Sequence, residues 1–198
     1  MDDLDALVDA ARAGGGWAFG RLWETLAPVV AAYLRARGVR DADDATSEVF
    51  LAAFRGIGRF EGDGAAFRSW LFTIAHHKGV DAHRRSARGE LLTGGGRSGG
   101  DEELAERSGR RAPSAEDEAM VLIGTEEALR RLAVLTEDQR AVLLLRVVAE
   151  LSLAETAQVL GRPVGAVKAL QHRALARLRH VQPLAVSPDR RRTITRTT

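Results

Sequence analysis

The chain has 198 residues, 45% of them hydrophobic, and a formal net charge of +2, a composition that suits one large or two small globular cores. It contains no cysteine, so disulfides and thiolate metal sites are excluded and a reducing compartment is expected. The acidic N-terminus lacks the pattern of a signal peptide, and no apolar run approaches the ~20 residues that span a bilayer. We therefore expect a cytoplasmic protein without membrane insertion.

The charge is distributed unevenly along the chain. Residues 1–88 carry 12 basic and 12 acidic residues, residues 89–118 carry 4 and 8, and residues 119–198 carry 13 and 7. A basic C-terminal part behind an acidic middle is typical of a C-terminal module that is attracted to polyanions such as nucleic acid.

The first half of the chain shows helical periodicity throughout. Apolar residues at helical spacing predict helices that start near Leu4, Trp17 and Asp41. The glycines at 14–16 end the first of these, and Pro28 is expected to kink or divide the second.

A fourth helix is predicted after the loop at 59–64, from about Ala65 to Arg85. It starts with aromatic and aliphatic residues and continues with basic ones. Aromatic and basic side chains together are suited to holding single-stranded nucleic acid by stacking and phosphate contact.

The rest of the chain divides by composition. Glycine, serine and acidic residues at 89–118 predict a flexible linker, and residues 183–198 predict a disordered basic tail. The sequence therefore predicts an all-α fold of two small helical domains, at 1–88 and 119–182, with a helix-turn-helix in the second.

This helix-turn-helix covers residues 151–179. Ser152 and Glu155 have the spacing of a capping box. Gly161 stands where the backbone commonly becomes left-handed after a helix, and Pro163 stands where the second helix would start. Such a unit places its second helix in a DNA groove.

The second helix has an apolar stripe and a cationic outer face. The stripe consists of Val167, Leu170, Ala174 and Leu178, with Leu175 at its border. The candidate DNA contacts are Arg162, Lys168, Gln171, His172, Arg173 and Arg177. A cationic face alone is more often a solvated surface, but the capped helix-turn-helix pattern favours DNA contact.

Two blocks of sequence resemble one known family. Residues 41–55 resemble the polymerase-binding helix of bacterial sigma factors, and residues 60–85 resemble the promoter-melting segment that follows it. Residues 135–140 and the helix-turn-helix resemble the family's region 4. The short chain resembles the extracytoplasmic-function (ECF) group of the sigma-70 family.

The resemblance implies three sets of functional residues. The polymerase-binding positions are Asp41, Asp44, Glu48 and Phe50, for which helix capping and core packing are the alternative roles. The contacts to the −10 element are Arg59, Phe60, Asp63, Arg68, His77, Lys78, Arg84 and Arg85. The contacts to the −35 element are the residues of the recognition helix named above.

Some residues depart from the family pattern. Thr136 stands where proline is common, although a threonine cap can do the same local work. Thr136 and Gln139 also have the spacing of a second capping box. Leu170 stands where an arginine is often used, while Gln171 can read adenine in a bidentate manner. The promoter sequence does not follow from these residues. No cofactor is expected, and we expect no metal at His76, His77 and His83, because neither cysteine nor a carboxylate cluster lies near them.

The resemblance implies a sigma factor, which is not an enzyme, with core RNA polymerase and promoter DNA as partners and an anti-sigma factor as a further candidate. One alternative is a free-standing helix-turn-helix regulator that binds an operator. Another is an interaction module that sequesters a partner. The regulator leaves the acidic helix and the aromatic-basic segment of the first half unexplained. The interaction module predicts that charge reversal at Lys168 and Arg173 leaves activity unchanged.

Overall fold

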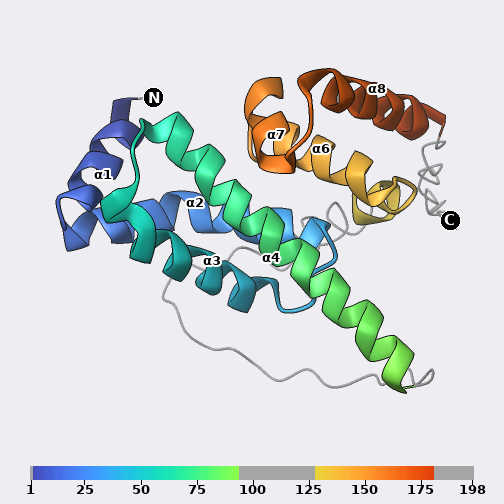
Figure 1. Ribbon diagram of the computed structural model, residues 1–198, viewed down its shortest axis with the longest axis horizontal. Helices are drawn as coiled ribbons and strands as arrows, with labels where there is room; N and C mark the ends of the chain where they lie inside the picture. Colours follow the sequence, from blue (N-terminus) through green and yellow to red (C-terminus); the bar gives the residue numbers. More distant parts are fainter. Residues whose placement is uncertain (1, 94–127, 181–198) are drawn as a thin grey trace, which may run out of the picture.

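A computed structural model describes residues 2–93 and 128–180, and these ranges contain helices and short turns without any strand (Figure 1). This confirms the all-α fold. The elements are α1 (Asp2–Arg12), α2 (Gly16–Ala36), α3 (Ala42–Gly56), the 3₁₀ turn η1 (Ile57–Arg59), α4 (Gly64–Thr93), α6 (Glu137–Val147), α7 (Leu153–Leu160) and α8 (Val164–His180). No helix of the described ranges is long and apolar enough to cross a membrane. The predicted tail, and the predicted linker from residue 94 on, lie outside the described residues.

Helices α1 to α4 form the N-terminal domain around an aromatic core. Trp23 packs edge-on against Phe50 with ring centroids 4.8 Å apart, and Phe19 packs against Phe54 at 4.7 Å. Tyr33 meets Phe72 at 5.4 Å. Each aromatic contact of this kind adds to the free energy gained by burying the rings. The core therefore fixes α3 and α4 on α2, and these two helices carry most of the N-terminal candidate residues.

The second helix is longer than its proline suggests. Pro28 lies inside α2 and does not divide it, contrary to one of the two outcomes expected for it. Leu26, Val30 and Leu34, on both sides of the proline, are fully buried. Their packing holds both halves in one helix, since tertiary contacts outweigh the local cost of proline.

Helix α4 also extends beyond its predicted end. It continues through Gly89 to Thr93, five residues into the segment predicted as linker. A single glycine costs a helix only about 1 kcal/mol. The residues after Gly89 include Glu90 and Leu91, which favour helix and were outweighed in the prediction by the glycine-rich composition that follows.

The C-terminal domain confirms the predicted helix ends. The Ser152 Oγ accepts a hydrogen bond from the Glu155 backbone N–H at 3.1 Å, and the Ser152 N–H donates to the Glu155 side chain at 2.6 Å. Thr136 and Gln139 form a second capping box at the start of α6. Gly161 is left-handed, with φ at +59°. The helix-turn-helix thus has well-defined ends for α7 and α8.

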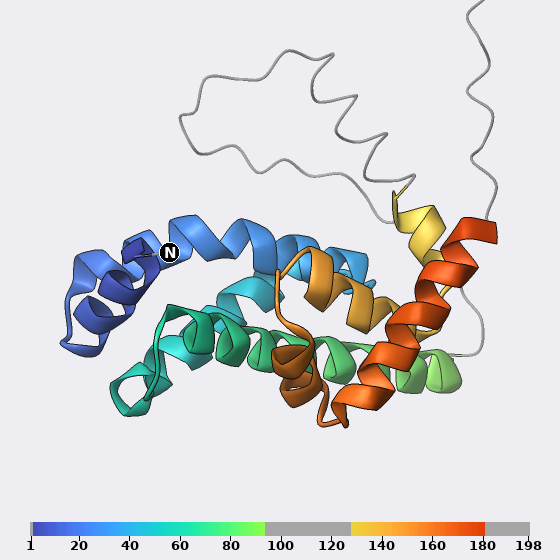
Figure 2. The same ribbon diagram turned by 90° about the horizontal axis from the view of Figure 1, so that it is seen from above.

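The two domains contact each other, which the sequence did not indicate. Helix α7 lies against α4, and α6 approaches α2 (Figure 2). Buried residues of α6, α7 and the turn between them belong to the same apolar cluster as the core of the N-terminal domain: Leu144, Leu145, Ala149, Leu151 and Val159. The described parts of the two domains therefore share one continuous apolar core.

Candidate nucleic-acid interface

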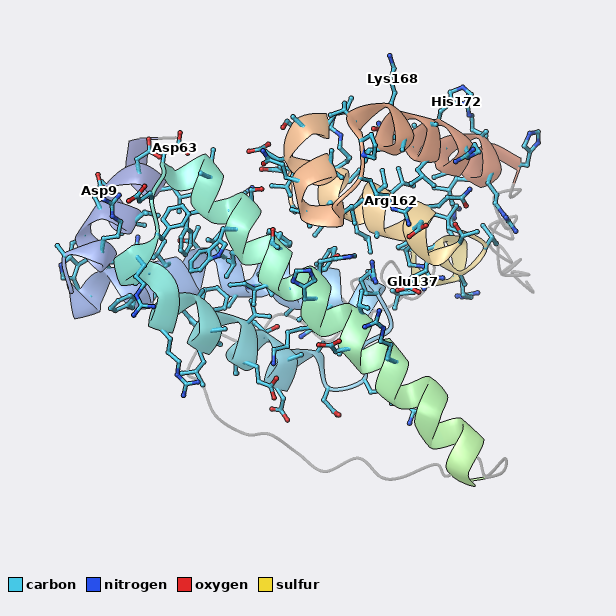
Figure 3. The ribbon with its side chains drawn as sticks, in the orientation of Figure 1. Asp9, Asp63, Glu137, Arg162, Lys168 and His172 are labelled. Carbon is cyan, nitrogen blue, oxygen red and sulfur yellow. The ribbon has the colours of Figure 1, made fainter. Side chains whose placement is uncertain are left out.

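The outer face of α8 is open to solvent. Val167, Leu170 and Ala174 are buried against the rest of the C-terminal domain, as the predicted stripe requires. The opposite face exposes Lys168, His172, Arg173 and Arg177. Figure 3 shows Lys168 and His172 projecting away from the body of the molecule. Long cationic side chains on a protruding helix can reach both phosphates and base edges in a DNA groove.

Two other candidates of this domain lie at the edge of that face. Arg162, in the turn before α8, pairs with Asp138 of α6 through an Nη2–Oδ2 distance of 2.6 Å. Gln171 is half-buried beside the apolar stripe. Arg162 is thus partly engaged within the domain, whereas Lys168 and His172 are presented outward.

The loop before α4 is built around an aromatic stack. Phe60 stacks on Trp70 with centroids 5.1 Å apart and lies edge-on to Phe67 at 5.7 Å. The Asp63 Oδ1 accepts a hydrogen bond from the Ala66 N–H at 2.8 Å, which caps the first turn of α4. Both residues therefore have structural roles, while the exposed side of the loop also presents Arg59.

The basic residues of α4 differ in what they contact. His77 and Arg84 are exposed, whereas Lys78 pairs with Glu48 of α3 at 2.7 Å. Arg68 pairs with Glu150 of the C-terminal domain, with its Nη1 2.9 Å from the Glu150 carboxylate. The side chain of Arg85 lies outside the described part of the chain.

On α3 the acidic candidate residues are exposed, whereas the aromatic candidate is buried. Asp41 and Asp44 are exposed at the helix start, and Glu48 pairs with Lys78 of α4. Phe50 is only 1% exposed and packs between Trp23 and Phe54. The structure therefore corrects Phe50 as a surface contact, because its ring supports α3 from within the core.

A buried polar cluster escaped the sequence analysis. The His76 Nδ1 lies 3.2 Å from the Tyr33 hydroxyl and 3.5 Å from Nη1 of Arg37, whose Nη2 donates to the Glu137 carboxylate at 2.7 Å. Arg37 precedes a glycine and reads as an ordinary helix end. No local pattern indicates that it is buried, because its carboxylate partner lies 100 residues further along the chain.

The environment of this cluster shifts two pKa values. Burial, followed by the nearby Arg37 charge and by His77, lowers the pKa of His76 from 6.5 to about 4. Arg162 acts in the same direction, and Asp138 opposes it. Burial raises the pKa of Tyr33 to about 12, in spite of the opposing charge of Arg37. At neutral pH the imidazole is therefore neutral, and the single lone pair of an unprotonated Nδ1 can accept a hydrogen bond from the Tyr33 hydroxyl, with Arg37 as the more distant donor.

The histidines do not assemble a metal site in the described structure. The rings of His76 and His77 lie 6.1 Å apart, and the described residues contain no group of three or more histidine, cysteine or acidic side chains placed to hold a metal. The side chain of His83 lies outside this description.

Comparison with known proteins matches both domains. Residues 22–89 match the family described as sigma-70 region 2, and residues 131–180 match sigma-70, region 4. The chain is 38% identical to the ECF RNA polymerase sigma factor SigD of Mycobacterium tuberculosis over 89% of this chain and 82% of that protein. It is 34% identical to the ECF sigma factor ShbA of Streptomyces griseus over 89% and 93%.

Two solved structures share the fold of this chain. The sigma factor CnrH, in a complex with the cytosolic domain of CnrY, superposes with a TM-score of 0.64 at 25% identity, covering 89% of this chain and 95% of that one. The Bartonella quintana sigma factor RpoE, solved with the anti-sigma factor NepR, shares the fold with a TM-score of 0.59 at 19% identity, covering 81% of this chain and 94% of that one.

The chain belongs to the sigma-70 family, among the ECF RNA polymerase sigma factors. Proteins of this class direct RNA polymerase to promoters in transcription initiation, and this is the function of the chain. The family is a class of non-catalytic initiation factors. Because both sigma regions are present in the family's order, the alternative of a free-standing helix-turn-helix regulator is excluded.

Proposed function

We propose that the two domains divide promoter recognition between them. The helix-turn-helix domain contacts the −35 element through the outer face of α8. The N-terminal domain contacts core polymerase through α3 and the −10 element through the loop at 59–64 and through α4. The exposed cationic face of α8, with Lys168 and His172 directed outward, is the observation that carries this proposal.

For the −10 element we propose contacts that use the exposed groups first. Arg59, His77 and Arg84 face solvent and can bind phosphates of a single strand. Phe60 and Asp63 shape the loop, because one belongs to the aromatic stack and the other caps α4. Binding energy from such contacts opens the duplex, and no covalent step on this chain is required.

For polymerase we propose Asp41, Asp44 and Glu48 as the contact surface. Asp41 and Asp44 are exposed at the N-terminal end of α3, where a carboxylate also interacts favourably with the helix dipole. Core polymerase and promoter DNA both reside in the cytoplasm, so we place the chain there. An anti-sigma factor is a further proposed partner, because the structural relative RpoE was solved with the anti-sigma factor NepR.

The test is transcription in vitro with purified core polymerase and promoter fragments recovered by selection from genomic DNA. We expect the chain to bind core polymerase and to support initiation at a subset of fragments. Asp44→Lys should weaken polymerase binding about fivefold or more, because it places a like charge against a complementary surface, whereas Glu24→Lys, on an exposed site of α2, should not. Absence of any binding to core polymerase would refute the proposed assignment.

A further inference from the structure

Helix α1 lies beside the loop that is proposed to contact the −10 element. The helix precedes residues 22–89, the range that matches sigma-70 region 2, so that match assigns it no role. Its buried side chains include Leu7 and Val8, which belong to the same apolar cluster as Ile57 of η1 and Phe67 of α4. Helix α1 therefore contacts both elements that flank the loop at 59–64 (Figure 1).

The start of α4 is joined to α1 by a hydrogen bond. The Gly64 N–H donates to the Asp5 Oδ1 at 2.6 Å. The first N–H groups of a helix have no partner within the helix, and a carboxylate close to them also interacts favourably with the helix dipole. Asp63, which Figure 3 shows at this end of α4, accepts from the Ala66 N–H. The first turn of α4 is thus capped twice, by its neighbour in sequence and by a residue 59 positions earlier.

The approach of α1 leaves no room for a side chain at position 64. A Cβ on Gly64 would lie 2.7 Å from the Asp5 Oδ1 and 2.8 Å from the Leu4 Cγ, well inside van der Waals contact. Glycine costs a helix stability relative to alanine. The closeness of α1, rather than helix propensity, therefore accounts for a glycine at this position.

The other end of the loop is held by η1 and by the aromatic stack. The Phe60 N–H donates to the Ile57 carbonyl at 3.0 Å, and Ile57 is buried against the core that includes α1. The Phe60 ring stacks on Trp70 of α4. Arg59 stands between these contacts and is exposed. The place of its guanidinium therefore depends on how firmly η1 and the start of α4 are held together.

We propose that Asp5 is a positioning residue for the −10 contacts, because its carboxylate holds the start of α4 against α1 and so fixes the path of the loop that presents Arg59. The proposal rests on the proposed assignment of this loop to the −10 element. Asp5 itself contacts no DNA. A loop that is ordered before binding loses less conformational entropy on binding, and the apparent affinity falls in proportion when only a fraction of the chains is ordered.

The position of the loop can be measured without DNA or polymerase. The chain has three tryptophans, so Trp17→Phe together with Trp23→Phe leaves Trp70 as a single fluorophore. Phe60 of the loop stacks on this indole. Adding Asp5→Ala should shift the Trp70 emission to longer wavelength, because a loosened loop admits water to the ring.

Two further variants at carboxylates of α1 test the hydrogen bond itself. Asp5→Asn should retain the original emission, because an amide oxygen can still accept from the Gly64 N–H. Asp9→Ala is the matched control, since Asp9 is an exposed carboxylate of the same helix that pairs within α1, with Arg12. It should leave the emission unchanged.

Binding of single-stranded DNA provides the second readout. A fluorescent oligonucleotide of mixed sequence should bind Asp5→Ala about three- to tenfold more weakly than the unaltered chain, the factor that corresponds to one hydrogen bond. Arg59→Gln should weaken binding by itself, and Asp5→Ala should add no further loss in that background. Val30→Ala, at a fully buried position of α2, destabilises the same domain but keeps the hydrogen bond, so it should leave the affinity unchanged at a temperature where all variants are folded.

The same contact can be perturbed from the side of α4. Gly64→Ala should shift the Trp70 emission and weaken oligonucleotide binding as Asp5→Ala does, because the added Cβ displaces the carboxylate. Gly79→Ala is the matched control in the same helix, where the nearest atoms to an added Cβ are 4.0 Å away, and it should do neither. Helix propensity alone would make both substitutions stabilising.

The outcomes separate the positioning role from the assignment on which it rests. The role is overturned if Asp5→Ala leaves the emission unchanged, or if Asp5→Asn behaves like Asp5→Ala. A shifted emission with unchanged affinity also overturns it, and Arg59→Gln then shows how far the failure extends. If Arg59→Gln weakens binding, the loop contacts DNA without help from Asp5 and the assignment stands. If Arg59→Gln has no effect, the proposed contact of the loop with the −10 element fails as well.

Discussion

Stability should depend on pH through His76 in a direction set by its burial. The pKa of His76 is lowered from 6.5 to about 4, chiefly by burial and then by Arg37. The unfolded chain therefore binds a proton between these values while the folded chain does not, and the free energy of unfolding rises with pH across this interval. The stabilisation is complete above pH 6.5, and it is lost progressively as the pH falls toward 4.

The magnitude follows from the same values. A difference between 6.5 and about 4 sets an upper limit of about 3 kcal/mol, since each pH unit corresponds to about 1.4 kcal/mol. The ring is only partly buried, so water screens the interaction and we expect about 1–2 kcal/mol. Urea unfolding of the unaltered chain and of His76→Gln at pH 4.5 to 7.5 measures this difference.

The comparison between variants removes the contribution of the carboxyl groups, which titrate in both. His76→Gln should flatten the pH dependence, while the control His172→Gln, at an exposed ring on α8 that is not among the groups acting on His76, should retain it. Parallel pH profiles for the unaltered chain and His76→Gln would refute the reasoning. A steeper profile for His76→Gln would show that the histidine is protonated in the folded state.

Three other perturbations test the framework of the two domains. Gly161→Ala should lower the free energy of unfolding by about 1 kcal/mol, because φ is +59° there. Gly165→Ala, inside α8 where an added Cβ meets open space, should raise the free energy of unfolding by ~0.5–1 kcal/mol. Urea unfolding distinguishes the two variants. Phe50→Ala should destabilise the chain by about 3–5 kcal/mol, as expected for a ring that is 1% exposed, and a loss below 1 kcal/mol would contradict its placement in the core. Lys168→Gln should reduce the slope of log K against log salt concentration for duplex binding by roughly one unit. Fluorescence anisotropy between about 50 and 200 mM KCl measures this slope. An unchanged slope would remove Lys168 from the phosphate contacts.

The features that could be predicted from the sequence are those set by neighbouring residues. The capping boxes at Thr136 and Ser152 and the left-handed Gly161 follow from spacings of a few positions, and the structure has all three. The apolar stripe of α8 follows from helical periodicity in the same way. Local propensity gave less reliable answers where packing competes with it, as at Pro28. It also misplaced the end of α4, because the glycine-rich composition that follows outweighed the helix formers after Gly89.

The contact between the domains could not be predicted in this way. The partners Arg37 and Glu137 lie 100 residues apart, and Arg68 and Glu150 lie 82 apart. Each of the four has the appearance of a solvated surface charge in the sequence. Their pairing depends on how α6 and α7 settle on α2 and α4, which is a property of shape complementarity between two complete domains. The sequence left two roles open for Phe50, polymerase contact and core packing, and its burial corresponds to the second.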